Sequence, residues 1–201
     1  MRPLFAATCA SATLIASGLS AQEGLSPAEL VETMRDGGVV IFIRHATTET
    51  DYADQVSADP LNCSTQRTLS EMGWHEAVQI GESFRYFDIP VDDVISSQYC
   101  RAWQTAWLAF GRYTQNAGLN FAAAEDYTDA QIAQMREGMM SAMTMPLPDG
   151  ENRVLVGHDD PFEAATGIYP EPMGVTYVLR ADGLGGFQVL GHIPPDGWPG
   201  Q

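Results

Sequence analysis

The sequence predicts a three-layer α/β/α domain with a mainly parallel central sheet and an antiparallel hairpin at its C-terminal edge. Two apolar runs, residues 39–43 and 154–156, are typical of strands buried on both faces, which belong to parallel sheets covered by helices. Segments with helical periodicity lie between these runs, and this alternation favours a sheet covered on both sides. Nothing in the sequence indicates an internal repeat or a second domain.

Three helices can be placed by their apolar periodicity and their end signals. The first is predicted over residues 27–35, where Ser26 can cap the N-terminus and a Gly-Gly pair at 37–38 ends the helix before the first buried strand. The second begins at a capping box over residues 68–71, and apolar residues then recur every three or four positions as far as Phe87. A short strand at 94–95 leads into the third, which ends at Gly111.

The second half of the chain predicts further elements. Residues 120–122 are expected to form a short strand, and residues 129–143 a methionine-rich helix that fills the core or lines an apolar rim of the site. Gly157, at the end of the second buried strand, is expected to allow a tight turn. Residues 175–180 and 186–192, separated by Asp-Gly-Leu-Gly, predict the terminal hairpin.

The composition is strongly acidic, with 26 aspartates and glutamates against ten arginines, no lysine, and a formal charge of −16. Such a surface repels nucleic acid and anionic membranes, so no nucleic-acid partner is expected and polyanionic substrates are disfavoured. An arginine followed by a short apolar stretch and Ser-Ala-Gln is typical of a secretory signal peptide, with an uncleaved anchor as the alternative. We therefore expect residues 1–21 to be removed. Residues 22–201 would form a periplasmic or secreted domain with no stable membrane insertion.

Arginines and histidines recur where parallel strands end. Arg44 and His45 follow the first buried strand, His158 follows the second, and Arg101 lies in the first turns of a helix. Ligands of such sheets bind beyond the carboxyl ends of the strands, and guanidinium groups near helix N-termini favour phosphate oxygens. The sequence therefore predicts a pocket for a dianionic tetrahedral group. The polar segment 47–67 is read as a loop that forms one wall, with two substrate contacts expected from it: Thr48 and Arg67.

Four motifs together resemble the histidine phosphatase superfamily, the phosphoglycerate-mutase-like group. They are Ile43-Arg44-His45-Ala46, Arg67-Thr68-Leu69-Ser70-Glu71-Met72-Gly73, the stretch from Ser96 to Ala106, and Gly157-His158. The resemblance implies metal-independent hydrolysis of a phosphomonoester without a cofactor. His45 would attack phosphorus and become phosphohistidine, while Arg44, Arg101 and a protonated His158 stabilise the phosphoryl oxygens. Ala46, where glycine is common, and the acidic pair after His158 depart from the family pattern.

The resemblance leaves the general acid open between two carboxyl groups. Asp159 follows His158 as in the His-Asp pair of the acid-phosphatase branch, and Glu125 lies nearer to where the mutase-like branch places its glutamate, which would also contact the substrate. We favour Asp159, because a motif fixes its position. A metal hydrolase is disfavoured, since the sequence has no histidine pair or cysteine spacing of a zinc site.

The expected substrate is a small phosphorylated compound, and export leaves an envelope sugar phosphate as a candidate. The alternative is a non-catalytic periplasmic module of the same fold that binds a phosphorylated ligand. Two cysteines remain after signal removal, Cys63 and Cys100, each beside a predicted pocket element. Export permits a disulfide between them, with two free thiols as the alternative. The sequence does not indicate an oligomeric state.

Overall fold

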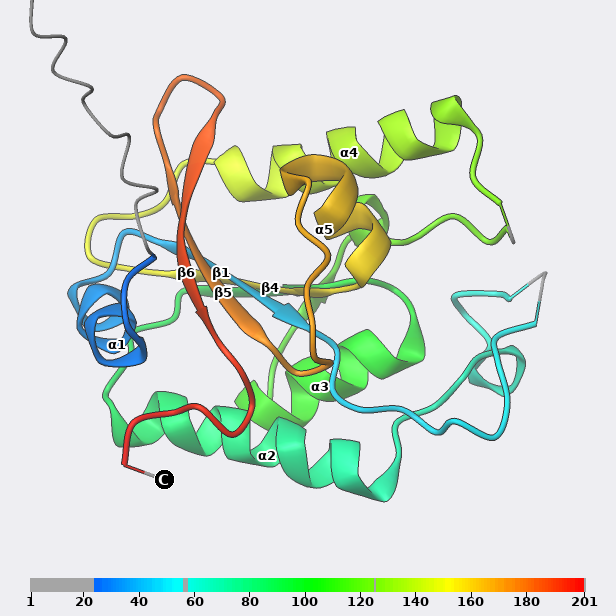
Figure 1. Ribbon diagram of the computed structural model, residues 1–201, viewed down its shortest axis with the longest axis horizontal. Coiled ribbons are helices and arrows are strands. Elements are labelled where there is room, and N and C mark those ends of the chain that lie inside the picture. Colours follow the sequence, from blue (N-terminus) through cyan, green and yellow to red (C-terminus); the bar gives the residue numbers. More distant parts are fainter. Residues whose placement is uncertain (1–23, 56–57, 125, 201) are drawn as a thin grey trace, which may run out of the picture.

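The computed structural model describes residues 24–55, 58–124 and 126–200, so the expected signal peptide lies outside the described residues. One mixed sheet of six strands is covered by helices on both faces (Figure 1). Its order is β3-β2-β4-β1-β5-β6. The strands are β1 Val40–Arg44, β2 Asp93–Ser96, β3 Thr114–Gln115, β4 Arg153–Gly157, β5 Thr176–Ala181 and β6 Phe187–Ile193. Strands β1 to β4 are parallel, and β5 and β6 are antiparallel, which confirms the predicted fold.

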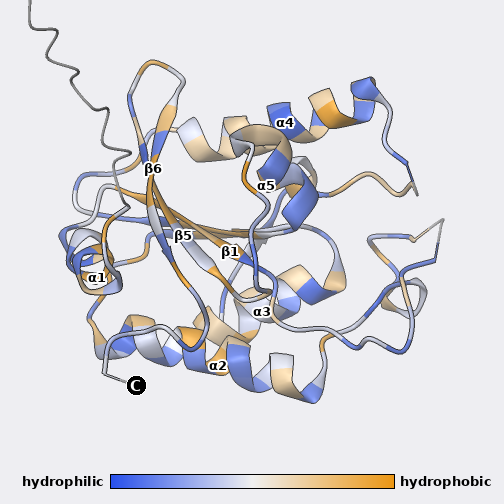
Figure 2. Cartoon of the chain, viewed as in Figure 1, coloured by the Kyte–Doolittle hydropathy of each residue, from blue (hydrophilic) through white to orange (hydrophobic). Residues whose placement is uncertain are grey.

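The central strand β1 is buried along its whole length because its two faces pack against different layers. Ile41 and Ile43 belong to an apolar cluster with α1 (Pro27–Asp36), α2 (Glu71–Tyr86) and α3 (Cys100–Phe110). Val40 and Phe42 belong to a second cluster with α4 (Asp129–Thr144) and α5 (Asp159–Thr166). In Figure 2 the central strands are orange, whereas the helices alternate between orange and blue. The alternation of side chains along one strand thus holds together the three layers.

Helix α2 begins later than the sequence predicted. Its N-cap is Ser70, whose Oγ accepts from the backbone N–H of Gly73 at 3.1 Å, so the expected capping box at Thr68 is wrong. Thr68 is engaged elsewhere: its carbonyl accepts from Glu49, and its hydroxyl lies 2.7 Å from that of Tyr52. Gly73 is needed for close approach, because a Cβ there would lie 1.8 Å from the carbonyl oxygen of the first residue of loop 47–67.

Other expectations need correction or are now decided. Residues 120–122 form no strand, because the side chain of Asn120 is tied to the end of β2, and the edge strand β3 lies earlier in the chain. Gly157 ends β4 without a left-handed turn; its small size leaves room for the ring of Phe42, 3.3 Å from a hypothetical Cβ. Met139 and Met143 of α4 are fully buried and fill the core. Helix α5 was not predicted.

The termini of the described chain lie near β6 and α2. The backbone N–H of Leu25 donates to the carbonyl of Leu190 in β6, and Trp198 packs against Phe84 and Phe87. Within the described ranges, no helix combines the length and apolar character needed to cross a membrane.

Candidate active site

The sheet topology brings the predicted site residues to one edge. Strands β1, β2 and β4 are parallel neighbours, so their carboxyl ends meet there. His45 follows β1 and its N–H donates to the carbonyl of Gly157 at 2.9 Å, which places it beside His158. The ring centroids of the two histidines are 5.3 Å apart. Arg44, His45, Arg101 and His158 are all at least 94% buried.

His45 is held as one tautomer by its neighbours. Its Nδ1 lies 2.9 Å from the carbonyl oxygen of Ala46, which can only accept, so Nδ1 carries the proton. Its Nε2 then has a lone pair, and this atom accepts from Nε of Arg101 at 3.1 Å. Burial, and next the charge of Arg101, lower the pKa of His45 well below 6.5. His45 is therefore a neutral imidazole with a nucleophilic Nε2.

Ala46, the departure from the family pattern, is accommodated. Its side chain packs with Leu69 and Ala77 in a small apolar cluster, and its N–H donates to Oγ1 of Thr105 at 3.0 Å. Because its carbonyl still binds Nδ1 of His45, the methyl group in place of a hydrogen leaves the orientation of the imidazole intact.

A chain of hydrogen bonds fixes the tautomer of His158. The backbone N–H of Gln98 donates to Oδ1 of Asn120 at 2.9 Å, so that oxygen is an acceptor and receives the hydroxyl proton of Ser97 at 2.8 Å. Ser97 Oγ must then accept from Nε2 of His158, 2.9 Å away. Nδ1 of His158 is left with a lone pair, buried and without a hydrogen-bond partner among the described residues.

The ligand-free site favours a neutral His158, and the imidazolium expected beside a bound phosphoryl group stays a prediction. Burial lowers its pKa well below 6.5, and Arg101 and His45 add to this effect. Protonation of His158 requires an anion beside Nδ1. The sequence alone does not show whether this imidazole is neutral or protonated. Its edge contacts with Tyr99 and Phe121, at centroid distances of 5.3 and 4.8 Å, complete its enclosure.

Both arginines predicted to be catalytic form ion pairs with aspartates. Arg101 donates from Nη1 to Asp54 at 2.9 Å, and Arg44 donates from Nη2 to Asp159 at 2.5 Å. The other Nη of Arg44 donates to the carbonyl of Pro170 at 2.9 Å, and its Nε is buried without a partner in the described chain. Burial lowers the pKa of Arg101, an effect that Asp54 opposes. The site is a cluster of cations that is already partly neutralised.

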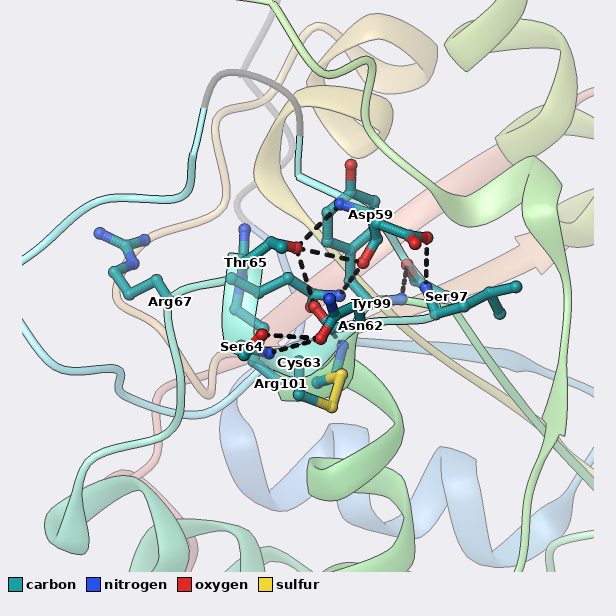
Figure 3. The surroundings of a disulfide bond; sticks show 12 residues. Asp59, Asn62, Cys63, Ser64, Thr65, Arg67, Ser97, Tyr99 and Arg101 are labelled. Carbon is teal, nitrogen blue, oxygen red and sulfur yellow. Dashed lines mark hydrogen bonds between the residues drawn. A yellow bond between two sulfur atoms is a disulfide. The ribbon is translucent and has the colours of Figure 1, made fainter.

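The predicted disulfide is confirmed. Cys63 lies in a short 3-10 turn of loop 47–67 and Cys100 is the first residue of α3; their Cα atoms are 5.6 Å apart (Figure 3). Beside it, the side chain of Gln66 accepts from the backbone N–H of Cys100 at 2.8 Å. Because Arg101 follows Cys100, the disulfide attaches the loop directly to the helical turn that carries a catalytic guanidinium.

The remaining predicted site residues lie at different places relative to the pocket. Arg67 is half-buried, its charge contributes to the lowered pKa of His45, and its Nε has no partner among the described residues, so it adjoins the pocket. Thr48 is buried, and its hydroxyl is directed to the sulfur of Met173 at 3.5 Å. Asp159 accepts from Arg44 and from the hydroxyl of Tyr169 at 2.8 Å. Glu125 lies outside the described residues. The substrate contacts of Arg67, Thr48 and Glu125 and the acid role of Asp159 stay predictions.

Sequence reasoning missed two carboxyl groups. Asp54 accepts from both Arg101 and the backbone N–H of Arg67, and only the folding of loop 47–67 brings it to the site. Asp160 is half-buried and accepts from Tyr127 at 2.8 Å; burial raises its pKa. Nothing local distinguishes either from the other acidic residues of the chain. The described residues contain no group of three or more histidines, cysteines or carboxylates able to hold a metal ion.

Solved structures of other proteins share the fold of this chain. Among solved structures, the chain is similar to phosphoserine phosphatase from Entamoeba histolytica in complex with 3-phosphoglyceric acid, with a TM-score of 0.59 and 15% identity over 80% of this chain and 98% of that one. It is also similar to the protein histidine phosphatase SixA complexed with tungstate, with a TM-score of 0.57 and 12% identity over 78% and 97%. A mycobacterial glucosyl-3-phosphoglycerate phosphatase gives 0.54 and 14% over 76% and 97%.

At these identities the structural likeness shows the fold alone. A comparison with curated protein sequences finds no match. The family model of branch 1 of the histidine phosphatase superfamily matches residues 40–154, which is more than half of the chain and includes Arg44, His45 and Arg101. His158 lies just beyond the match, but the sheet places it against His45. The chain belongs to the histidine phosphatase superfamily.

Proposed function

We propose that this protein hydrolyses a small phosphomonoester through a phosphohistidine intermediate on His45. The observation that carries the proposal is the state of that imidazole. Its Nδ1 proton is bound to the carbonyl of Ala46, its low pKa keeps it neutral, and the Nε2 lone pair is in contact with a guanidinium that can hold a phosphoryl oxygen. A buried neutral imidazole with arginines around its free nitrogen suits in-line attack on phosphorus.

The reaction has two displacements. In the first, the lone pair of His45 Nε2 forms the N–P bond, the P–O bond to the alcohol breaks, and the departing oxygen takes a proton from a carboxylic acid. In the second, the carboxylate takes a proton from water as the water oxygen attacks the phosphohistidine, the N–P bond breaks, and inorganic phosphate leaves with His45 and the carboxylic acid regenerated. Arg44, Arg101 and Arg67 supply the positive charge for the equatorial oxygens in both steps.

For the general acid we retain Asp159. Its carboxylate accepts from Arg44 and Tyr169 in the ligand-free site. A phosphoryl group that takes over the guanidinium of Arg44 leaves this carboxyl group next to the substrate, where it can act as the acid. Asp160 is the next carboxyl group along α5, and burial raises its pKa, so it is the natural comparison.

We further propose that the mature protein acts in the periplasm or outside the cell, where an envelope sugar phosphate is one possible substrate. The signal-like first 21 residues support this location, and so does the disulfide, because disulfides persist in oxidising compartments. Fractionation of cells that express the full chain, with mass measurement of the exported product, tests the location. A product that stays in the cytoplasm at full length would contradict it.

Purified mature protein should hydrolyse p-nitrophenyl phosphate, with activity unaffected by EDTA. Rapid acid-free quenching of a reaction with labelled substrate should trap phosphate on His45. His45→Ala should lose turnover by several orders of magnitude while keeping the wild-type fold, whereas substitution of the exposed His75 should change neither. Sulfate binding without hydrolysis of any phosphomonoester would instead favour the non-catalytic binding module.

A further inference from the structure

A groove of about 260 Å³ lies beside the site. Its polar lining residues are Asp54 and Gln55, and Phe121 forms an apolar wall. The other lining residues among those the structure describes are alanines: Ala53, Ala58, Ala123 and Ala124. The groove therefore lies between loop 47–67 and the segment that follows the short turn Ala117–Leu119.

The groove is continuous with the catalytic groups. Asp54 accepts from Arg101, whose Nε is in contact with the nucleophilic nitrogen of His45. The ring of Phe121 lies 5.0 Å from the guanidinium carbon of Arg101 and 4.8 Å from the ring of His158. A phosphoryl group held by Arg101 and His45 thus has this groove next to it, within reach of the alcohol to which it is esterified.

The charge of the lining differs from that of the phosphoryl pocket. The charges of Arg44, Arg67 and Arg101 act on His45, whereas the described lining of the groove contains the carboxylate of Asp54 and no arginine. The chain also has no lysine that could be recruited. Asp54 is paired with Arg101 in the ligand-free site, and a phosphoryl group that engages Arg101 would leave this carboxylate facing any second anionic group of the substrate.

We propose that this groove receives the alcohol of the phosphomonoester and selects compact alcohols that carry no negative charge. The inference rests on the proposed phosphatase function and adds the class of substrate. Phosphorylated hydroxy acids, phosphorylated amino acids with a free carboxylate, and bisphosphates are poor substrates on this basis. Neutral or cationic alcohols of modest size are good ones, because alanine side chains and Phe121 offer apolar contact without demanding a charged partner.

The test compares three aryl esters that differ in charge but little in leaving-group reactivity: phenyl, 3-(carboxymethyl)phenyl and 3-(aminomethyl)phenyl phosphate. At low salt, kcat/KM for the carboxylate ester should be lower than for phenyl phosphate on the order of tenfold, since the groove is open to solvent and screening limits the effect. The amine ester should match or exceed phenyl phosphate. Raising the salt concentration to about 0.5 M should reduce the difference in kcat/KM between the carboxylate ester and phenyl phosphate, because the Debye length shortens.

Two variants locate the effect. Ala123 is an exposed lining residue, so Ala123→Arg places a cation in the groove and should raise kcat/KM for the carboxylate ester on the order of tenfold. Ala130→Arg adds the same charge at an exposed position that does not line the groove, and it should leave the ratio between the esters unchanged. Asp54→Asn should reduce the ratio of kcat/KM between phenyl phosphate and the carboxylate ester, whatever its effect on the absolute rates.

Binding gives a readout that does not require turnover. Calorimetry with phenylphosphonate and 3-(carboxymethyl)phenylphosphonate should show the same order of affinity and the same response to Ala123→Arg. Equal rates and equal affinities for neutral and carboxylate compounds at low salt would overturn the inference. Absence of hydrolysis with the expected order of phosphonate affinities would overturn the phosphatase function alone and leave the groove's selectivity supported.

Discussion

Binding of a dianion at the site should take up about one proton, and His158 should receive it. The hydrogen bonds from Gln98 through Asn120 and Ser97 leave Nδ1 of His158 with a lone pair and no partner among the described residues. An oxyanion against His45 Nε2 lies within reach of that nitrogen, since the two rings are 5.3 Å apart. Lone pair and anion repel each other unless a proton lies between them.

The size of the effect follows from Coulomb's law. One unit of anionic charge in hydrogen-bond contact with an imidazolium gains about 5 kcal/mol at an effective dielectric constant of about 20, which is equivalent to a pKa rise of about 4. The pKa of ligand-free His158 lies well below 6.5, held down by burial and by Arg101. A rise of this size opposes the lowering of the pKa by burial and by Arg101, so we predict that the ligand-free site holds His158 unprotonated and the occupied site holds it protonated.

Calorimetric titration with sulfate measures this directly, because sulfate stays dianionic across the working range. The observed enthalpy should change with the ionisation enthalpy of the buffer with a slope of about one proton near neutral pH. Over that range, between the pKa of His158 in the ligand-free site and its pKa in the occupied site, the affinity should fall about tenfold per pH unit, and above the pKa of the occupied site it should level off. His158→Gln should bind with a slope near zero, while His75→Gln, changed at an exposed histidine, should behave as wild type. Tight sulfate binding by wild-type protein without proton uptake would refute the tautomer assignment.

Three further predictions concern the acid, the disulfide and acid stability. Asp159→Asn should slow an alkyl phosphate about 10²–10⁴-fold and p-nitrophenyl phosphate far less, and the same pattern in Asp160→Asn instead would move the role to that residue. Replacing Cys63 and Cys100 together by serine should lower the free energy of unfolding by about 4 kcal/mol in denaturant titrations, from the entropy of a loop with a sequence separation of 37; an unchanged midpoint would contradict this. His45 and His158 both have folded-state pKa values below the ordinary 6.5, so below that pH the unfolded chain binds protons that the folded chain excludes. As the pH decreases below 6.5, the free energy of unfolding should therefore decrease by up to about 1.4 kcal/mol per pH unit for each histidine. Glu76 and Asp160, whose pKa values burial raises, should partly offset this loss. A free energy of unfolding that stays constant between about pH 6.5 and about pH 5 would be inconsistent with two buried neutral imidazoles.

Much of the architecture could be predicted because it depends on local patterns. An uninterrupted apolar strand must be covered on both faces, and a parallel sheet then brings the residues after each strand to one edge. This reasoning was enough to place Arg44 and His45 near His158. The disulfide could be anticipated because only two cysteines remain beyond the expected signal peptide. Local sequence patterns were therefore enough to predict which distant residues meet at one edge of the sheet.

The parts that could not be predicted depend on where individual polar atoms lie after folding. Asp54 reaches Arg101 across 47 residues of sequence, and its role depends on the conformation of an irregular loop. The tautomer of His158 is set by Asn120, in a segment that the sequence wrongly predicted as a strand. Helix α5 was missed because its eight residues are too few to show a clear period.

The ion pairs of Arg44 with Asp159 and of Arg101 with Asp54 have a consequence for how the site handles its product. An incoming phosphate does not enter a vacant cationic pocket; it exchanges with carboxylates that are covalently part of the protein and that return when it departs. Each guanidinium therefore has an aspartate that can replace inorganic phosphate as its counterion. When phosphate leaves, the guanidinium need not remain buried without an ion-pair partner. If the protein hydrolyses phosphomonoesters as proposed, product inhibition by phosphate should be weak, because the aspartates can pair with the arginines again without an ion from solution.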